Sequence, residues 1–117
     1  MDERERMRAV LAEKAMGYEP CVCRRLHGEP EPCWKTQDMG RRIVQTDWHP
    51  DINWSQCGMV VEAMRAKEWN IEAYMNVKQA SVSFTRTDKD CYGEAEAPTF
   101  TEAVSLAAFR ALEATDD

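Results

Sequence analysis

One segment in the first third of the chain gathers residues that could bind a metal ion. The stretch CVCRRLHGEPEPC contains four soft ligands, the number that a tetrahedral zinc ion takes. These are Cys21, Cys23, His27 and Cys33. Structural zinc sites usually show Cys-x2-Cys or longer steps in two ligand pairs, and this spacing differs. Two interpretations therefore stay open: a zinc site, or a sulfur-rich loop without metal, since free cysteine is often buried.

The same cysteines could carry redox chemistry. Arg24 and Arg25 follow Cys23 and would lower its pKa if they pointed at the sulfur. The Cys-x-x-Cys spacing of oxidoreductases is absent from the sequence. The five cysteines and a charged N-terminus, where a secretory signal would be apolar, indicate reduced thiols in a cytoplasmic protein. Cys57 and Cys91 are expected in the core.

A second group of residues could line a pocket. His49 lies between Trp48 and Trp54 with carboxylates nearby in the sequence, so these side chains could stack on a ring or form the site of a small enzyme. A structural interpretation is also open, with the tryptophans at the edge of the core and a helix cap after His49. Sequence spacing gives no pair of carboxylates for acid–base catalysis, so no catalytic residue is predicted.

Basic residues are concentrated in the middle of an acidic chain. Arg41 and Arg42 could hold a phosphate-bearing ligand or could lie in a solvated loop. Aromatic anchors are common in binding surfaces. The residues predicted to contact a ligand or partner are Trp34, Arg41, Arg42, Trp48, His49 and Trp54.

Size and charge limit the function classes. The 117 residues are enough for one domain, and the net charge of −6 argues against nucleic-acid binding through phosphate contacts. An acidic protein could instead mimic nucleic acid or bind a basic partner. No run of about 18 apolar residues is present, so no membrane span is predicted.

Three amphipathic helices are predicted to position these residues. The first lies within the segment 2–20 and ends before Gly17, because glycine is typical of the position after a helix. The second spans 51–69. The third begins after Pro98, where Thr99 and a glutamate three residues later match a capping box.

Strands are predicted between the last two helices. IEAYMNV and QASVSFTRT alternate apolar and polar residues, and CYGEAEA would form a third strand with its small residues on one face and its acids on the other. Residues 19–50 show no sustained period and hold four of the five prolines. We expect an irregular, insertion-like segment there, with short extended pieces at CWK and RRIVQT.

These elements predict a single α+β domain over residues 1–117. A small antiparallel sheet cannot bury its apolar face alone, so helices must cover it. The expected architecture is an α/β/α layered sandwich, in which three helices cover a small, mainly antiparallel sheet of three to four strands. An exposed edge strand in such a short sheet would offer a surface for a homodimer.

Three sequence blocks resemble the phage ABA sandwich domain family. They are LAEKAMGYEP, HPDINWSQCGMVVEAM and YGEAEAPTFTEAVSLAAFRAL, and with the intervening strands they cover about residues 10–113. The resemblance implies an α–β–α fold and an origin in a phage, a prophage or a bacterium carrying one. It implies no activity. CVCRRLHGEPEPC lies outside the family pattern, so the resemblance leaves the metal question open.

The functional prediction rests on this resemblance. We expect a non-enzymatic phage or prophage accessory protein that binds a host protein or a small signalling ligand in the bacterial host cytoplasm, with an anti-defence role as its most concrete form. One alternative is a zinc-stabilised interaction module built on the Cys21–Cys33 loop. Another is a small enzyme with its pocket near His49.

Overall fold

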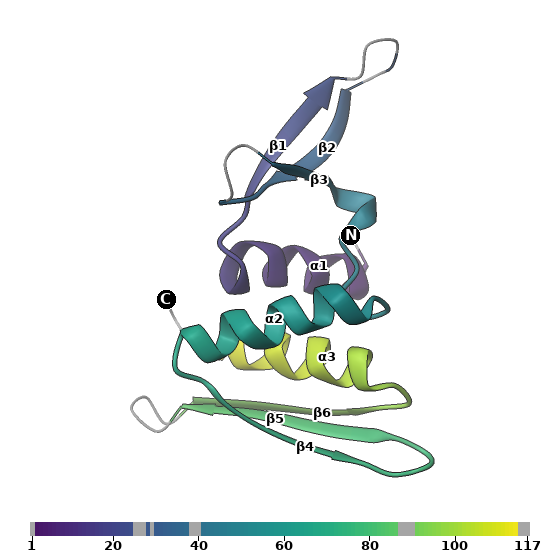
Figure 1. The fold of residues 1–117 in the computed structure, drawn as a ribbon, viewed down its shortest axis with the longest axis vertical. Helices are drawn as coiled ribbons and strands as arrows, with labels where there is room; N and C mark the ends of the chain where they lie inside the picture. Colours follow the sequence, from purple (N-terminus) through teal and green to yellow (C-terminus); the bar gives the residue numbers. More distant parts are fainter. Residues whose placement is uncertain (1, 25–27, 29, 38–40, 87–90, 115–117) are drawn as a thin grey trace.

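In a computed structural model, three helices lie between two small antiparallel sheets (Figure 1). The structure describes residues 2–24, 28, 30–37, 41–86 and 91–114, and the molecule measures 47 × 33 × 25 Å. The predicted α+β class is confirmed. The elements in chain order are α1 (Glu3–Val10), the π-helical η1 (Leu11–Ala15), β1 (Glu19–Arg24), β2 (Pro30–Lys35), β3 (Arg42–Val44), the 3-10 turn η2 (Gln45–Asp47), α2 (Trp54–Ala66), β4 (Asn70–Met75), β5 (Ala80–Arg86), β6 (Cys91–Ala97) and α3 (Phe100–Glu113).

The first helix widens part-way along its length. Asp2 caps α1 by accepting a hydrogen bond from the backbone N–H of Glu5 at 2.8 Å. In η1 the hydrogen bonds open to the wider π pattern, in which the N–H of Met16 donates to the carbonyl of Leu11 at 3.1 Å, and Leu11, Ala12 and Ala15 are buried. Gly17 follows with a φ of +72°, the left-handed conformation expected of a residue after a helix.

The segment 19–50 forms a sheet of its own. Strands β1, β2 and β3 pair antiparallel in that order, and the extended pieces expected at CWK and RRIVQT lie in β2 and β3. Trp34 lies opposite Ile43 and reaches the main core. The β1–β2 hairpin extends away from the helices (Figure 1).

The second sheet has the order β4-β5-β6 and packs one face against α3. On β5, Val82 and Phe84 are buried, as the alternating pattern predicts. On β6, Ala95 and Ala97 are buried while the intervening glutamates are exposed. This alternation leaves the other face of the sheet open to solvent.

Helix α3 lies unusually close to the sheet because small residues line the contact. Ala107 and Ala111 on the helix are fully buried. A Cβ atom on Gly93 of β6 would lie 2.2 Å from the backbone nitrogen of Ala111 and 2.5 Å from the carbonyl oxygen of Ala107. The glycine is therefore required by the contact. Thr99 caps α3 as predicted, accepting from the N–H of Glu102 at 3.3 Å.

Helix α2 is capped at its start by Asn53, whose side chain accepts a hydrogen bond from the N–H of Gln56 at 2.9 Å. Its buried residues are Cys57, Val60 and Met64. With α1 and α3, these side chains form the centre of the core.

Because Gly93 contacts the backbone of α3, adding one methyl group at this position should lower the stability of the protein strongly. Gly93→Ala must displace helix backbone, and we expect a loss of about 2–3 kcal/mol in the free energy of unfolding, measured by urea denaturation. Gly58→Ala is the matched control, because nothing lies within 4 Å of a Cβ at that helical position. It should stabilise by about 0.5–1 kcal/mol. Equal effects of the two substitutions would contradict this packing.

Candidate functional site

The tryptophans predicted to contact a ligand lie in different environments. Trp34 and Trp48 belong to the core, with 4% and 0% of their surfaces exposed, so they offer no surface to a partner. Trp54 is 66% exposed and stacks on Phe100, with ring centroids 5.5 Å apart. Of the three, Trp54 is placed to contact another molecule.

His49 lies in the turn that leads into α2. Its backbone N–H donates to Oε1 of Gln56 at 2.7 Å, and its carbonyl accepts from the N–H groups of Ile52 and Asn53. Its Nδ1 atom is buried and has no hydrogen-bond partner among the described residues. No carboxylate among the described residues accepts a hydrogen bond from this Nδ1 atom, so the structure does not show the His–carboxylate pair that would orient a catalytic ring.

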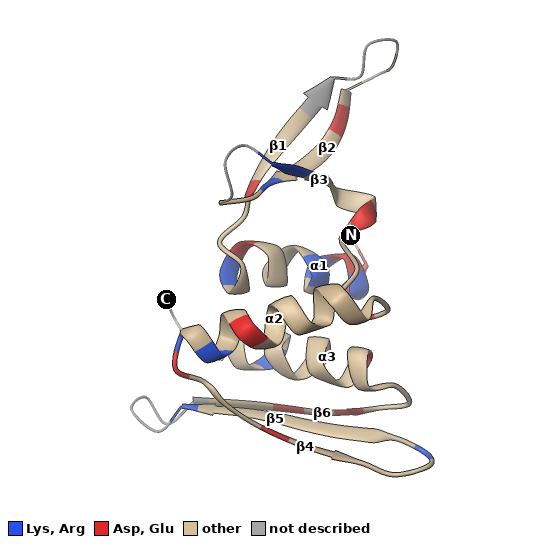
Figure 2. Ribbon diagram, in the orientation of Figure 1, with Lys and Arg blue, Asp and Glu red and all other residues tan. Residues whose placement is uncertain are grey.

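Arg41 and Arg42 are exposed at the start of β3, the strand that Figure 2 shows as basic. The carbonyl of Arg41 accepts hydrogen bonds from both the backbone N–H and the hydroxyl of Thr36. The two arginines belong to the first sheet, whereas Trp54 begins α2. The predicted ligand-binding residues therefore do not form one continuous site.

The cysteine segment forms part of the β1–β2 hairpin. Cys21 lies directly opposite Cys33, and the backbone of Cys23 lies opposite Glu31. The Cys23 side chain and all of His27 fall outside the described residues. Among the side chains that are described, no three potential ligands lie close enough to hold a metal ion. The zinc site stays a prediction.

A buried carboxylate is the main polar feature that the sequence did not reveal. Asp51 is 1% exposed, and its two oxygens accept hydrogen bonds from Nε and Nη2 of Arg8 at 2.8 and 3.0 Å. Nε of Arg4, one turn earlier on α1, lies 3.7 Å from the same carboxylate. The only sequence signal was the pair of arginines four residues apart, which places both on one side of a helix.

This arrangement keeps Asp51 ionised. Burial alone would raise the pKa of Asp51, but the hydrogen bonds and charge of Arg8, with a further contribution from Arg4, hold that pKa below its usual value. In turn, the hydrogen bond to the Asp51 carboxylate raises the pKa of Arg8. The pair is therefore charged throughout the physiological pH range.

The backbone around this pair is tied to three elements. The indole Nε1 of Trp48 donates to the carbonyl of Arg8 at 2.9 Å. The hydroxyl of Thr101, at the start of α3, donates to the carbonyl of Asp51 at 2.7 Å. The cluster thus joins α1, the segment before α2 and the first turn of α3, and its role is structural.

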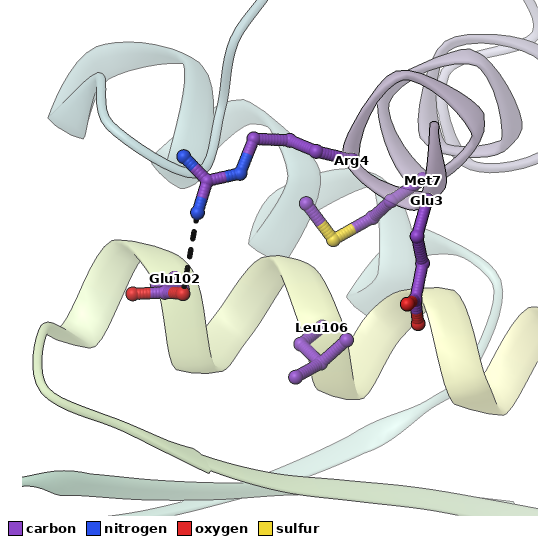
Figure 3. A pocket seen from close by; sticks show the side chains of 5 residues that line it. All are labelled: Glu3, Arg4, Met7, Glu102 and Leu106. Carbon is purple, nitrogen blue, oxygen red and sulfur yellow. Dashed lines mark ion pairs between the residues drawn. The ribbon is translucent and has the colours of Figure 1, made fainter. Parts of the chain in front are cut away.

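A hollow of about 320 Å³ lies between α1 and α3 (Figure 3). Arg4 extends across it to Glu102, with Nη2 3.6 Å from Oε1, above the apolar side chains of Met7 and Leu106. Glu3 also lines the hollow, so two carboxylates face one guanidinium and the net charge is −1. Because both carboxylates would repel an anion, this hollow does not suit a phosphate-bearing ligand.

The open face of the second sheet is the most distinctive exposed surface. Carboxylates on β4 and β6 flank the hydroxyls of β5, as the register shows: Glu72 and Glu94 both lie beside Ser83. Tyr74 and Tyr92 are 68% and 63% exposed. We call this surface the acidic face; it consists of Glu72, Tyr74, Ser81, Ser83, Tyr92, Glu94 and Glu96.

The carboxylates of the acidic face have no cationic partner within the described residues. Arg110 lies at the edge of the face, where its Nη1 donates to the backbone carbonyl of Glu94 at 2.8 Å. Glu96 accepts a hydrogen bond from the neutral amide of Gln79 at 3.1 Å. A hollow of about 230 Å³ lies among Glu72, Ser83 and Glu94. The surface is therefore negative, lightly concave and bordered by aromatic rings.

Comparison with known families, characterised proteins and solved structures adds no relative. No family model matches the chain, and neither characterised proteins nor solved structures give a significant match. The resemblance to phage ABA sandwich domains therefore stays a prediction. None of the described helices is both long enough and apolar enough to span a bilayer.

The buried ion pair predicts a specific pH dependence for Arg8→Met. The substitution leaves the Asp51 carboxylate buried without its main partner, and should cost about 3 kcal/mol of unfolding free energy at pH 7. The folded-state pKa of Asp51 is depressed, so its stabilisation is present above the unfolded pKa of about 3.9 and is lost as pH falls through the lower folded value. In the variant, burial favours protonation instead. The stability difference should therefore shrink as the pH falls below about 5.

Urea denaturation of both proteins between pH 3 and pH 8 measures this difference. Arg65→Met is the matched control, because Arg65 pairs with Glu62 on the surface of α2. Its effect should stay below about 0.5 kcal/mol at every pH. If the loss of unfolding free energy in Arg8→Met did not change with pH, that loss would not come from the charge of Asp51.

Proposed function

We propose that the protein acts by binding, and that the acidic face receives an extended, Lys- or Arg-rich segment of a partner protein. One observation carries the proposal: three carboxylates and two exposed tyrosines share an open sheet face, and these carboxylates have no cationic partner in the described part of the chain. Figure 2 shows acidic segments on β4 and β6.

The carboxylates are close enough for their fields to add. Neighbouring strands lie about 4.8 Å apart, so Glu72 and Glu94, two strands apart, are separated by about 10 Å. Glu94 and Glu96 alternate on one strand and lie about 7 Å apart. These distances are comparable with the Debye length of about 8 Å at physiological salt. A basic segment would therefore meet a combined negative potential.

The size of the face favours a segment over a globular surface. Three strands give a width of about 14 Å, and six residues give a length of about 20 Å, or roughly 300 Å². A standard interface between globular proteins takes about 800 Å² from each partner. An extended peptide of about seven residues matches the smaller area, and the exposed tyrosines can act as its anchors.

The resemblance to phage ABA sandwich domains supplies the biological setting of the proposal. In that setting the partner would be a host protein, and its capture would serve an anti-defence role. A basic segment is also the ligand class that a net charge of −6 favours. A small signalling ligand has less support, because the hollow between α1 and α3, which Arg4 crosses, already has a net negative charge.

Removing the charges of the acidic face should weaken binding of a basic peptide. The probe is a fluorescein-labelled peptide of about seven residues that alternates arginine and threonine, measured by fluorescence anisotropy at low salt. The triple variant Glu72→Gln, Glu94→Gln, Glu96→Gln should bind at least about 3-fold more weakly, since exposed ion pairs contribute about 0.2–1 kcal/mol each. Binding by the natural protein should also weaken as salt is raised.

The matched control removes the same number of charges elsewhere. Glu13, Glu19 and Glu62 are exposed on other elements, and their replacement by glutamine should change the affinity less than about 2-fold. Equal losses in the two triple variants would show that only net charge matters. The proposal would be refuted if the natural protein bound the arginine–threonine peptide no more tightly than a peptide of the same length that alternates serine and threonine.

A further inference from the structure

Two cysteines of the β1–β2 hairpin occupy directly opposed positions. Cys21 pairs with Cys33 in the antiparallel register, next to the pair formed by Val22 and Pro32. Opposed residues in antiparallel strands project to the same side of the sheet, with Cα atoms about 4.5 or 5.5 Å apart. Disulfide-bonded cysteines have Cα atoms about 4.4–6.8 Å apart, so either spacing is compatible with a bond.

The required movement of the strands is small. Opposed Cβ atoms in a sheet lie about 4.5–5.5 Å apart, whereas a disulfide brings them to about 3.5–4.5 Å. Closing this difference takes about 1 Å of local adjustment. Both residues carry thiols in the structure.

The two thiols differ in their access to solvent. Cys21 is partly exposed, whereas Cys33 is 1% exposed and its Sγ lies 3.3 Å from the carbonyl oxygen of Glu31. A small reagent in solution would therefore meet Cys21 first. Cys33, directly opposite on the neighbouring strand, is the thiol in register with any bond that forms at Cys21.

We propose that Cys21 and Cys33 are a thiol pair that forms a reversible intramolecular disulfide, which links β1 to β2 when the surroundings become oxidising. The co-reactant is a small-molecule disulfide such as glutathione disulfide. This inference does not depend on the acidic face, which belongs to the other sheet.

The exchange balances in two steps. The Cys21 thiolate attacks one sulfur of the small disulfide, forming a mixed disulfide and releasing one small-molecule thiolate. The Cys33 thiolate then attacks the Cys21 sulfur, forming the Cys21–Cys33 bond and releasing the second thiolate. The protein loses two electrons and two protons, and both are recovered in two small-molecule thiols.

The bond would close the hairpin around its tip. The sequence between the two cysteines contains Arg24 and Arg25, which are sites for trypsin. In the oxidised protein, a chain cut at either arginine would remain joined through the disulfide. In the reduced protein, the same cut would leave the two parts held by noncovalent contacts alone, among them the strand pairing and the packing of α1 in the core.

Mass spectrometry tests the proposal. The full chain is treated with glutathione disulfide, and its mass should fall by about 2 Da without a retained glutathione adduct. After tryptic digestion without reductant, the peptides containing Cys21 and Cys33 should be joined, and dithiothreitol should separate them. The midpoint of thermal unfolding should rise by roughly 5 °C in the oxidised protein.

Three variants make the assignment specific. Cys21→Ser removes a partly exposed side chain, so it should fold and lose both the linkage and the thermal shift. Cys57→Ser and Cys23→Ser should keep both. Cys57 is a suitable control because burial raises its pKa to about 11, which keeps its thiol protonated and unreactive.

Other products would overturn the proposal. A stable mixed disulfide at Cys21 would show that Cys33 cannot reach it. A linkage of either residue to Cys23, or one that persists in Cys21→Ser, would assign the chemistry to a different pair. No change in mass under conditions that oxidise a cysteine-containing control peptide would show that the pair does not react.

Discussion

The arrangement of the three helices depends on the carboxylate of Asp51, which is buried away from solvent. A buried aspartate is tolerated only when cations and hydrogen-bond donors replace its hydration. Arg8 supplies two donors to Asp51, and Arg4 adds a second positive charge from one turn earlier on α1. The backbone on either side is held as well, since Trp48 donates to α1 and Thr101 donates to the Asp51 carbonyl. One polar cluster therefore fixes α1, the entry to α2 and the start of α3 relative to one another.

Helix α3 makes charged contacts on one side and apolar contacts on the other. Toward α1, carboxylates and guanidinium groups are paired, as Arg4 with Glu102 shows. Toward the second sheet the contact is made by alanines and Gly93, which need no charge and bring the helix close. Because this one helix covers the inner face of the sheet, the outer face is left open, and its glutamates are unpaired within the described chain. Paired charges thus stabilise the fold, whereas the unpaired ones are available for recognition.

Local patterns in the sequence predicted much of this arrangement. The Thr99 cap, the glycine after the first helix and the alternation from Tyr92 to Ala97 each depend on residues a few positions apart, and each has its expected structure. The first sheet was harder to predict, because prolines and short strands leave no period to detect. The pairing of Arg8 with Asp51 joins positions 43 residues apart, and the hydrogen bond from Thr101 to the Asp51 carbonyl joins positions 50 residues apart. Such contacts follow from the tertiary fold, so spacing alone could not identify them.

The central structural claim is that Arg8 and Asp51 stabilise the protein as a pair. A double-mutant cycle with Arg8→Met, Asp51→Asn and the combined variant measures it directly, using urea denaturation at pH 7. If the account is correct, the double variant is less destabilised than the sum of the single variants, by at least about 2 kcal/mol. Effects that add to within about 0.5 kcal/mol would contradict it, because they would mean that each side chain acts through other contacts.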